Sequence, residues 1–103
     1  MKIEILDEAE SDIVNGMNFY ESQSVNLGNY FLDSILSDID SLYLYASIHV
    51  KTNDYYRLLS KRFPFAIYYK VNNDVAYVYA VLDCRQNPSW IQTKLDTKTI
   101  RGK

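Results

Sequence analysis

The spacing of hydrophobic residues changes near residue 55 and divides the chain into a helical part and a strand-forming part. Residues 2–6 alternate between polar and apolar, which predicts a short strand. Apolar side chains then recur every three or four positions, which predicts a helix that begins at an N-cap Asp7 and ends near Ser22. One face of this helix is formed by Ala9, Ile13, Met17 and Tyr20.

A second helix follows a break at Asn26 or Gly28. Its apolar residues again recur at helical spacing and form one stripe of Leu27, Phe31, Ile35, Ile39, Leu42 and Ala46. Asp33, Asp38 and Asp40 lie mostly off this stripe. The two helices are therefore predicted to form a hairpin with an acidic outer surface.

Beyond residue 55 the apolar period becomes two, which predicts strands over residues 55–61, 65–71 and 75–83. Phe63-Pro64 predicts a bend between the first two, because proline has no N–H for a sheet and fixes its own φ. Residues 72–74 (Asn-Asn-Asp) predict a hairpin turn between the last two, because Asn and Asp tolerate positive φ.

The order strand, helix, helix, three strands predicts an α+β fold of type β-α-α-β-β-β, with the helical hairpin packed on one face of a mainly antiparallel sheet. The first strand is expected to pair within the same sheet. The tail after Pro88 is expected to be short and to end in a turn of helix anchored by Trp90, Ile91 and Leu95. At 103 residues, the chain is expected to form one domain over residues 1–103.

The last strand predicts which sheet face stays uncovered. Ala76, Val78, Ala80 and Leu82 are small or apolar and suit packing beneath the helices. By alternation, Tyr77 and Tyr79 are expected on the open face, beside Tyr68 and Lys70 of the neighbouring strand. A one-residue slip in register would reverse this assignment.

Charge is distributed unevenly along the chain. Residues 1–50 carry nine acidic residues and one lysine, a net charge of −8, whereas residues 51–103 carry ten basic and four acidic residues, a net charge of +6. This asymmetry can produce a dipolar surface. Equally, the two halves can attract each other across the fold, where individual surface charges contribute little.

Composition narrows the function classes further. Cys84 is the only cysteine, so neither an intramolecular disulfide nor a cysteine zinc cluster can form, and we expect no metal or other cofactor. The sequence has no apolar run of signal-peptide or membrane-spanning length. The protein is therefore expected to be cytoplasmic and not to bind membranes.

Four segments in this order resemble the RelE/ParE toxin superfamily: residues 18–21 (NFYE), 27–31 (LGNYF), 62–69 (RFPFAIYY) and 80–88 (AVLDCRQNP). Its members are toxins of type II toxin–antitoxin modules and are also called plasmid stabilisation proteins. The resemblance covers nearly the whole chain. It implies a small toxin that is neutralised by a cognate antitoxin encoded beside it.

The superfamily divides by target. RelE-like members cleave mRNA on the ribosome, whereas ParE-like members share the fold but inhibit DNA gyrase. The Leu27-Gly28 opening and residues 62–65 (RFPF) resemble the ParE side more closely. An inactive relative that only binds its antitoxin is a third interpretation, and homodimerisation is left open.

RNA cleavage needs a base, an acid and cations near the reacting phosphate. The candidate cations, which would also serve to bind a protein target, are Arg57, Lys61, Arg62 and Arg85. The only histidine, His49, is expected in a loop away from the centre of the sheet. Asp83 stands where many relatives carry histidine, but beside Arg85 its pKa should fall, which weakens it as an acid. An Asp83–Arg85 structural pair is the simpler interpretation.

Arg85, Asp83 and Arg62 therefore remain weak catalytic candidates, and a non-enzymatic toxin is favoured. The low pI of 5.2 points the same way, because nucleases that act on the ribosome usually carry strong positive charge. Among the ten tyrosines, some are expected to contact the antitoxin, and the predicted partner-binding residues are Tyr68, Tyr77, Tyr79 and Trp90. Parts of the antitoxin that contact the acidic helices should be basic.

Overall fold

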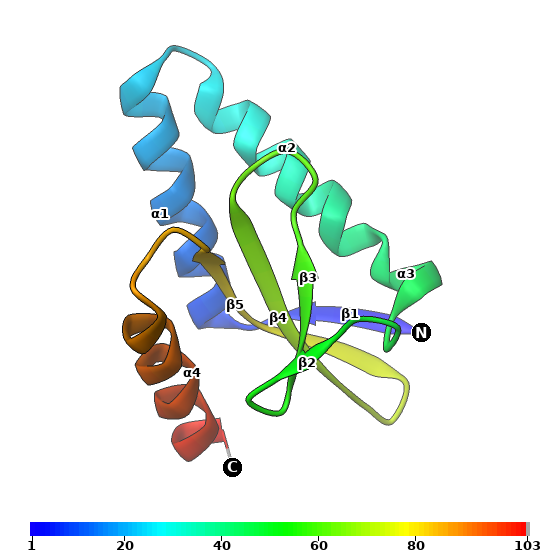
Figure 1. Cartoon of the computed structure of the whole chain (residues 1–103). Coiled ribbons are helices and arrows are strands. Elements are labelled where there is room, and N and C mark those ends of the chain that lie inside the picture. The colour runs from blue at the N-terminus through cyan, green and yellow to red at the C-terminus, as the bar shows by residue number, and fades with distance from the viewer. Residues whose placement is uncertain (103) are drawn as a thin grey trace.

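The computed structural model describes residues 1–102 and consists of one sheet with helices on both of its sides (Figure 1). Its elements in chain order are β1 (Lys2–Ile5), α1 (Asp7–Gln23), α2 (Leu27–Asp40), α3 (Leu42–Tyr45), β2 (Lys51–Thr52), β3 (Tyr55–Leu59), β4 (Phe65–Asn72), β5 (Val75–Asp83) and α4 (Pro88–Gly102). The sheet has five strands in the order β1-β5-β4-β3-β2. Among the strand pairs in the described residues, only β1–β5 is parallel. The predicted α+β fold, with a helical hairpin on a mainly antiparallel sheet, is confirmed.

The hairpin of α1 and α2 covers one face of the sheet and forms the main core with it. Phe31 and Ile35 of α2 are fully buried, as are Ile67 and Val78 of the sheet. Close approach of the helices depends on Gly16, whose missing side chain leaves room for the Phe31 ring. The apolar stripes predicted from helical spacing therefore face the sheet.

The ends of the helices differ in part from the sequence prediction. Asp7 is the first helical residue rather than the N-cap; Leu6 takes the cap position and makes no side-chain cap hydrogen bond. The acidic first turn still suits the positive end of the helix dipole. The second helix ends at Asp40, and Ser41 separates it from the short α3.

Two hairpin turns use the same chemistry. Asn73 and Asp74 have φ of 51° and 64°, which confirms the predicted turn between β4 and β5. Asn53 and Asp54 have φ of 53° and 69° and connect β2 to β3 in the same way. The sequence prediction of four strands missed β2 because only two of its residues pair with β3.

A bulge in β5 overturns part of the predicted face assignment. Tyr68 pairs with Ala80 but Tyr69 pairs with Val78, so Tyr79 is an extra residue in β5. Before the bulge, Val78 faces the hairpin as predicted. After it the alternation reverses: Ala80 packs with residues of the opposite face, as does Leu82, whereas Val81 packs with the hairpin core.

The C-terminal tail is longer than predicted and forms α4, which packs against the second face of the sheet. Leu95 is fully buried there, and Ile91 packs beside it, whereas Trp90 is 40% exposed and does not anchor the helix. Tyr68 is only 2% exposed, so the expectation that it lies on an uncovered face is wrong. Lys98 of α4 also bonds Glu8 of α1, with 2.7 Å between Nζ and Oε1.

Within residues 1–102, no helix is both long and apolar enough to cross a membrane.

We predict that Gly16→Ala destabilises the protein, although alanine is favoured over glycine in helices by about 1 kcal/mol. A Cβ at residue 16 would lie 2.5 Å from the buried Phe31 ring. Overpacking of this kind costs about 1–3 kcal/mol, which exceeds the gain in helix propensity, so a net loss of up to about 2 kcal/mol is expected in urea unfolding. Asn18→Ala, on the exposed side of the same helix, is the control and should change stability by less than about 0.5 kcal/mol. A stabilised Gly16→Ala variant would contradict the close packing.

Candidate functional site

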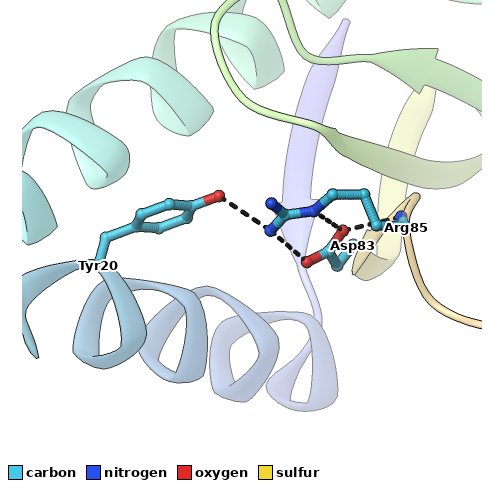
Figure 2. A network of polar contacts seen from close by, with 3 residues as sticks. All are labelled: Tyr20, Asp83 and Arg85. Atoms are coloured by element: carbon cyan, nitrogen blue, oxygen red, sulfur yellow. Dashed lines mark hydrogen bonds and ion pairs between the residues drawn. The ribbon is translucent and has the colours of Figure 1, made fainter. Parts of the chain in front are cut away.

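Arg85 lies just after β5 and is held from two sides (Figure 2). Its Nε donates to Asp83 Oδ1 at 3.0 Å, and its Nη2 donates to Asp83 Oδ2 at 2.8 Å. The backbone N–H of Arg85 also donates to Asp83 Oδ1 at 2.8 Å. On the other side, Nη2 lies 3.4 Å from the hydroxyl oxygen of Tyr20 in α1. The guanidinium is thus oriented between the strand end and the helical hairpin, although its side chain is 57% exposed.

The bidentate pair fixes the charge of both groups. The hydrogen bonds from Arg85 lower the pKa of Asp83 below its ordinary value, and those to Asp83 raise the pKa of Arg85. Both groups are therefore charged at neutral pH. Asp83 holds no proton to donate there, and its two oxygens are already occupied by Arg85.

Arg85 borders an open cleft of about 540 Å³ between α1, the end of β5 and α4. Asp12 and Phe19 of α1 line one side, and Trp90 and Lys94 of α4 line another. Phe19 is 50% exposed and Trp90 is 40% exposed, and the Lys94 Nζ lies 5.3 Å from the centre of the Trp90 ring. The cleft combines aromatic surface with charges of both signs.

Asp12 completes the hydrogen bonding of β5 inside this cleft. The pairing of β1 with β5 ends at Ile5 and Val78, so the Val81 N–H lies beyond the reach of β1. Asp12 Oδ2 accepts a hydrogen bond from this N–H at 3.0 Å. Burial raises the pKa of Asp12, while the hydrogen bond from Val81 and the nearby Lys98 and Lys94 act in the opposite direction. The carboxylate thus satisfies a backbone donor that would otherwise be unpaired.

Arg57 lies on the opposite face of the sheet. Its Nε donates to the Tyr68 hydroxyl at 3.2 Å, and its Nη2 lies 3.5 Å from Cys84 Sγ. The hydrogen bond to Tyr68 raises the pKa of Arg57. These contacts hold the Arg57 guanidinium beside Tyr68, so Arg57 and Arg85 do not form one cluster of positive charge.

Lys61 and Arg62 are exposed in the loop between β3 and β4. This loop is attached to α2 by Asp38, whose Oδ2 accepts hydrogen bonds from Ser60 Oγ at 2.7 Å and from the Lys61 N–H at 3.4 Å. Asp38 is 5% exposed, so it does not belong to the acidic outer surface predicted from sequence. Burial with hydrogen-bond partners is the usual state of an interior carboxylate.

The structure brings the candidate cations to one end of the sheet, on two faces. A hydrogen bond of 2.7 Å from the Cys84 N–H to the Pro64 carbonyl joins the β3–β4 loop to the end of β5. Arg85 lies on the hairpin side of this end, and Arg57 lies on the α4 side. Together with Lys61 and Arg62 of the β3–β4 loop, these two arginines form a cationic rim around the end of the sheet rather than a single cluster.

The predicted partner-binding aromatics are not equally accessible. Tyr68 is buried, Tyr77 and Tyr79 are half-buried, and Trp90 is exposed in the cleft. Lys70 lies on the second face with its Nζ 4.6 Å from the centre of the Tyr55 ring and 5.5 Å from that of Tyr79. In this conformation of the protein, a partner can therefore contact the exposed ring of Trp90 and the exposed parts of the Tyr77 and Tyr79 side chains.

His49 lies in the loop after α3, as the sequence predicts. Its Nδ1 contacts the Tyr69 hydroxyl, which also accepts a hydrogen bond from the Ser47 N–H at 2.9 Å. Burial lowers the pKa of His49, so the ring is neutral at neutral pH. On β4, Tyr69 and Phe65 are four residues apart, which corresponds to about 13 Å, and Arg85 lies beyond the Phe65 end. His49, which contacts Tyr69, is therefore remote from Arg85.

Comparison with known proteins identifies the fold. No protein-family model matches the chain, and no curated protein matches it. The chain is similar to a chain of a solved structure described as "Chromosomal ParDE TA system from P. aeruginosa", with a TM-score of 0.69 and 14% sequence identity, over 79% of this chain and 92% of that chain. This chain has a ParE-like fold.

At 14% identity the likeness concerns the ParE-like fold alone, so the chemistry of the site rests on the residues described above.

Three residues of the site, Tyr20, Asp12 and Lys94, were not predicted from the sequence. Tyr20 recurs at helical spacing and was assigned to the core, yet a buried tyrosine hydroxyl needs a hydrogen-bond partner, and that requirement was the available signal. In the part of the chain that the structure describes, no three His, Cys, Asp or Glu side chains are grouped so that they could hold a metal ion.

We predict that Asp83→Asn lowers Tm at pH 7 by about 2–4 °C, as expected for a partly exposed ion pair. Because the pKa of Asp83 is lowered in the folded state, its contribution is present above the unfolded pKa and is lost as the pH falls below 3.8. The difference in Tm between the two proteins should therefore be constant from pH 8 to about pH 5 and shrink at lower pH. A difference that grows in acid would refute the ion pair.

Proposed function

We propose that this protein is a ParE-like toxin of a type II toxin–antitoxin module. The supporting observation is the fold match, which extends over 92% of a chain from a structure described as a ParDE toxin–antitoxin system. The four segments that resemble the superfamily fall on α1, α2, β4 and the end of β5, the elements that form the hairpin core and the Arg85 site. A cognate antitoxin is the partner that this function requires. Stabilising a plasmid is one role for such a module.

We further propose that the toxin acts by binding a protein target in the cytoplasm, with DNA gyrase as the preferred candidate. The proton-transfer groups near Arg85 do not favour catalysis. Asp83 is an ionised carboxylate held by Arg85, and the only histidine lies with Tyr69 near α3. The exposed members of the cationic rim, Lys61, Arg62 and Arg85, suit instead an acidic patch on a protein.

One observation favours the alternative, a RelE-like mRNA endonuclease that works on the ribosome. On the second face, Arg57 and Lys70 lie among tyrosine rings, and this combination is typical of surfaces that stack RNA bases. Leu95 of α4 packs over this face beside Tyr68, however, so α4 would have to move before bases could reach the buried ring. The binding mode is therefore preferred.

The two targets can be distinguished in cells and in vitro. The protein is expressed from an inducible promoter, growth is followed, mRNA is mapped by primer extension, and purified protein is added to a gyrase supercoiling assay. Growth arrest with inhibited supercoiling and intact mRNA is expected. Mapped mRNA cuts with normal supercoiling would reject the preferred target in favour of the nuclease. Normal growth would leave only an inactive relative that binds its antitoxin.

We predict that Arg85→Ala relieves growth arrest and raises the number of surviving colonies by at least about tenfold. The reason is that the oriented guanidinium is removed from the cationic rim. Arg85→Lys keeps the charge but not the planar fork, and should restore only part of the toxicity. Lys2→Ala, a cation on the edge strand β1, is the matched control and should remain toxic. Thermal unfolding checks that each variant is folded; full toxicity of folded Arg85→Ala would contradict the proposed role.

A further inference from the structure

The end of the helical hairpin away from Arg85 exposes an unusual amount of apolar surface. Leu44 is 80% exposed, Val50 is 77% and Ile48 is 72%, and Tyr43 and Tyr45 are more than half exposed. All five lie between residues 43 and 50, in α3 and the loop that follows it. Apolar side chains gathered in this way on a small protein mark an interaction surface more often than scattered ones do.

The exposed face of α2 continues this surface. Ser41 keeps right-handed helical dihedrals, with φ of −60° and ψ of −18°, so α3 follows α2 after a break of one residue (Figure 1). Asp33, Leu36 and Asp40 fall within about 60° of one another around α2, and Tyr43 and Leu44 are exposed on α3 directly after it. We call these five residues the α2–α3 ridge. It extends over about 16 Å at 1.5 Å per residue, which matches three turns of a partner helix.

The charge of the ridge is entirely negative. No lysine or arginine occurs between Lys2 and Lys51. Two other acids of the hairpin already have partners, because Glu21 accepts the N–H groups of Asn26 and Gly28 and Asp38 accepts that of Lys61. In the region that the structure describes, Asp33 and Asp40 form neither ion pairs nor side-chain hydrogen bonds.

This charge selects among the possible occupants. A second copy joined by a two-fold axis would place the same patch against itself and bring Asp33 and Asp40 close to like charges. An anionic membrane surface would meet the same repulsion. A basic polypeptide would instead neutralise both carboxylates while its apolar side chains cover Tyr43 and Leu44.

We propose that the α2–α3 ridge docks an amphipathic helix of a partner protein that carries apolar residues at helical spacing flanked by Lys or Arg. The apolar residues pack on Leu36, Tyr43 and Leu44, and the basic residues meet Asp33 and Asp40. That this partner is the antitoxin rests on the proposed function, whereas the docking chemistry does not.

The ridge is separate from the Arg85 site. Tyr20, which accepts the hydrogen bond from Arg85, packs on Phe31 near the start of α2, with 5.2 Å between ring centres. The ridge begins at Asp33, two residues after Phe31, and ends at Leu44, about 20 Å beyond Phe31 at 1.5 Å per residue. Asp38, which holds the loop of Lys61 and Arg62, points to the side of α2 opposite the ridge, so a helix on the ridge and a partner at the cationic rim contact different side chains.

The test uses a labelled 18-residue amphipathic peptide of leucine and lysine, titrated against the whole chain by fluorescence anisotropy. We expect binding that weakens by at least about tenfold in Leu44→Ser. Asp33→Asn with Asp40→Asn should also weaken binding and flatten its dependence on salt concentration. Val25→Ser is the matched control, since Val25 is 80% exposed like Leu44 but lies in the turn between α1 and α2.

Equal binding by the wild type and all variants would overturn the proposal, as would equal binding of a peptide in which glutamate replaces lysine. Sedimentation is measured in parallel; a dimer that Leu44→Ser dissociates would replace the basic helix with a second copy as occupant. The peptide titration needs no toxicity. Ridge binding without growth arrest would therefore count against the proposed function alone, and growth arrest without ridge binding against this proposal alone.

Discussion

One extra residue in β5 decides how the rest of the site is assembled. Because Tyr79 is an extra residue, β5 turns Ala76 and Val78 to the hairpin before the bulge and turns Val81 and Asp83 to the same hairpin after it. The Val81 N–H is then available to Asp12 of α1, and Asp83 directs Arg85 toward Tyr20. Without the bulge, regular alternation would turn Asp83 toward α4 and separate Arg85 from the hairpin.

The same reversal of faces explains how α4 is held. Ala80 and Leu82 turn to the second face, where they contact the buried Leu95 together with Tyr68. Lys98 then reaches Glu8, so the basic C-terminal half of the chain meets the acidic first helix directly. Part of the charge asymmetry is thus used within the molecule. What remains on the surface is a cationic rim at one end of the sheet and an acidic ridge on α2 and α3.

This separation of charge gives the ParE-like fold two distinct surfaces. The rim around Arg85 suits an acidic target, because the Nη1 group of the fixed guanidinium bonds neither Asp83 nor Tyr20 and can donate to a carboxylate or phosphate. The ridge suits a basic, apolar segment. Two partners of opposite charge could therefore use the two surfaces without competing for the same residues. Fold similarity alone carries no such conclusion; it comes from where this chain places its charges.

The sequence by itself determined the elements whose signals are local. Helical spacing in α1 and α2, the strand-forming runs of β4 and β5, and the positive-φ turn at Asn73 and Asp74 were readable because each depends on residues a few positions apart. The Asp83–Arg85 pair was readable for the same reason. Only the tertiary structure decided the bulge, because residues 75–82 are apolar or aromatic throughout and alternation alone cannot locate an extra residue. It also decided the contacts of Tyr20 with Arg85 and of Glu8 with Lys98, since partners 65 and 90 positions apart in the chain meet only when the whole sheet is assembled.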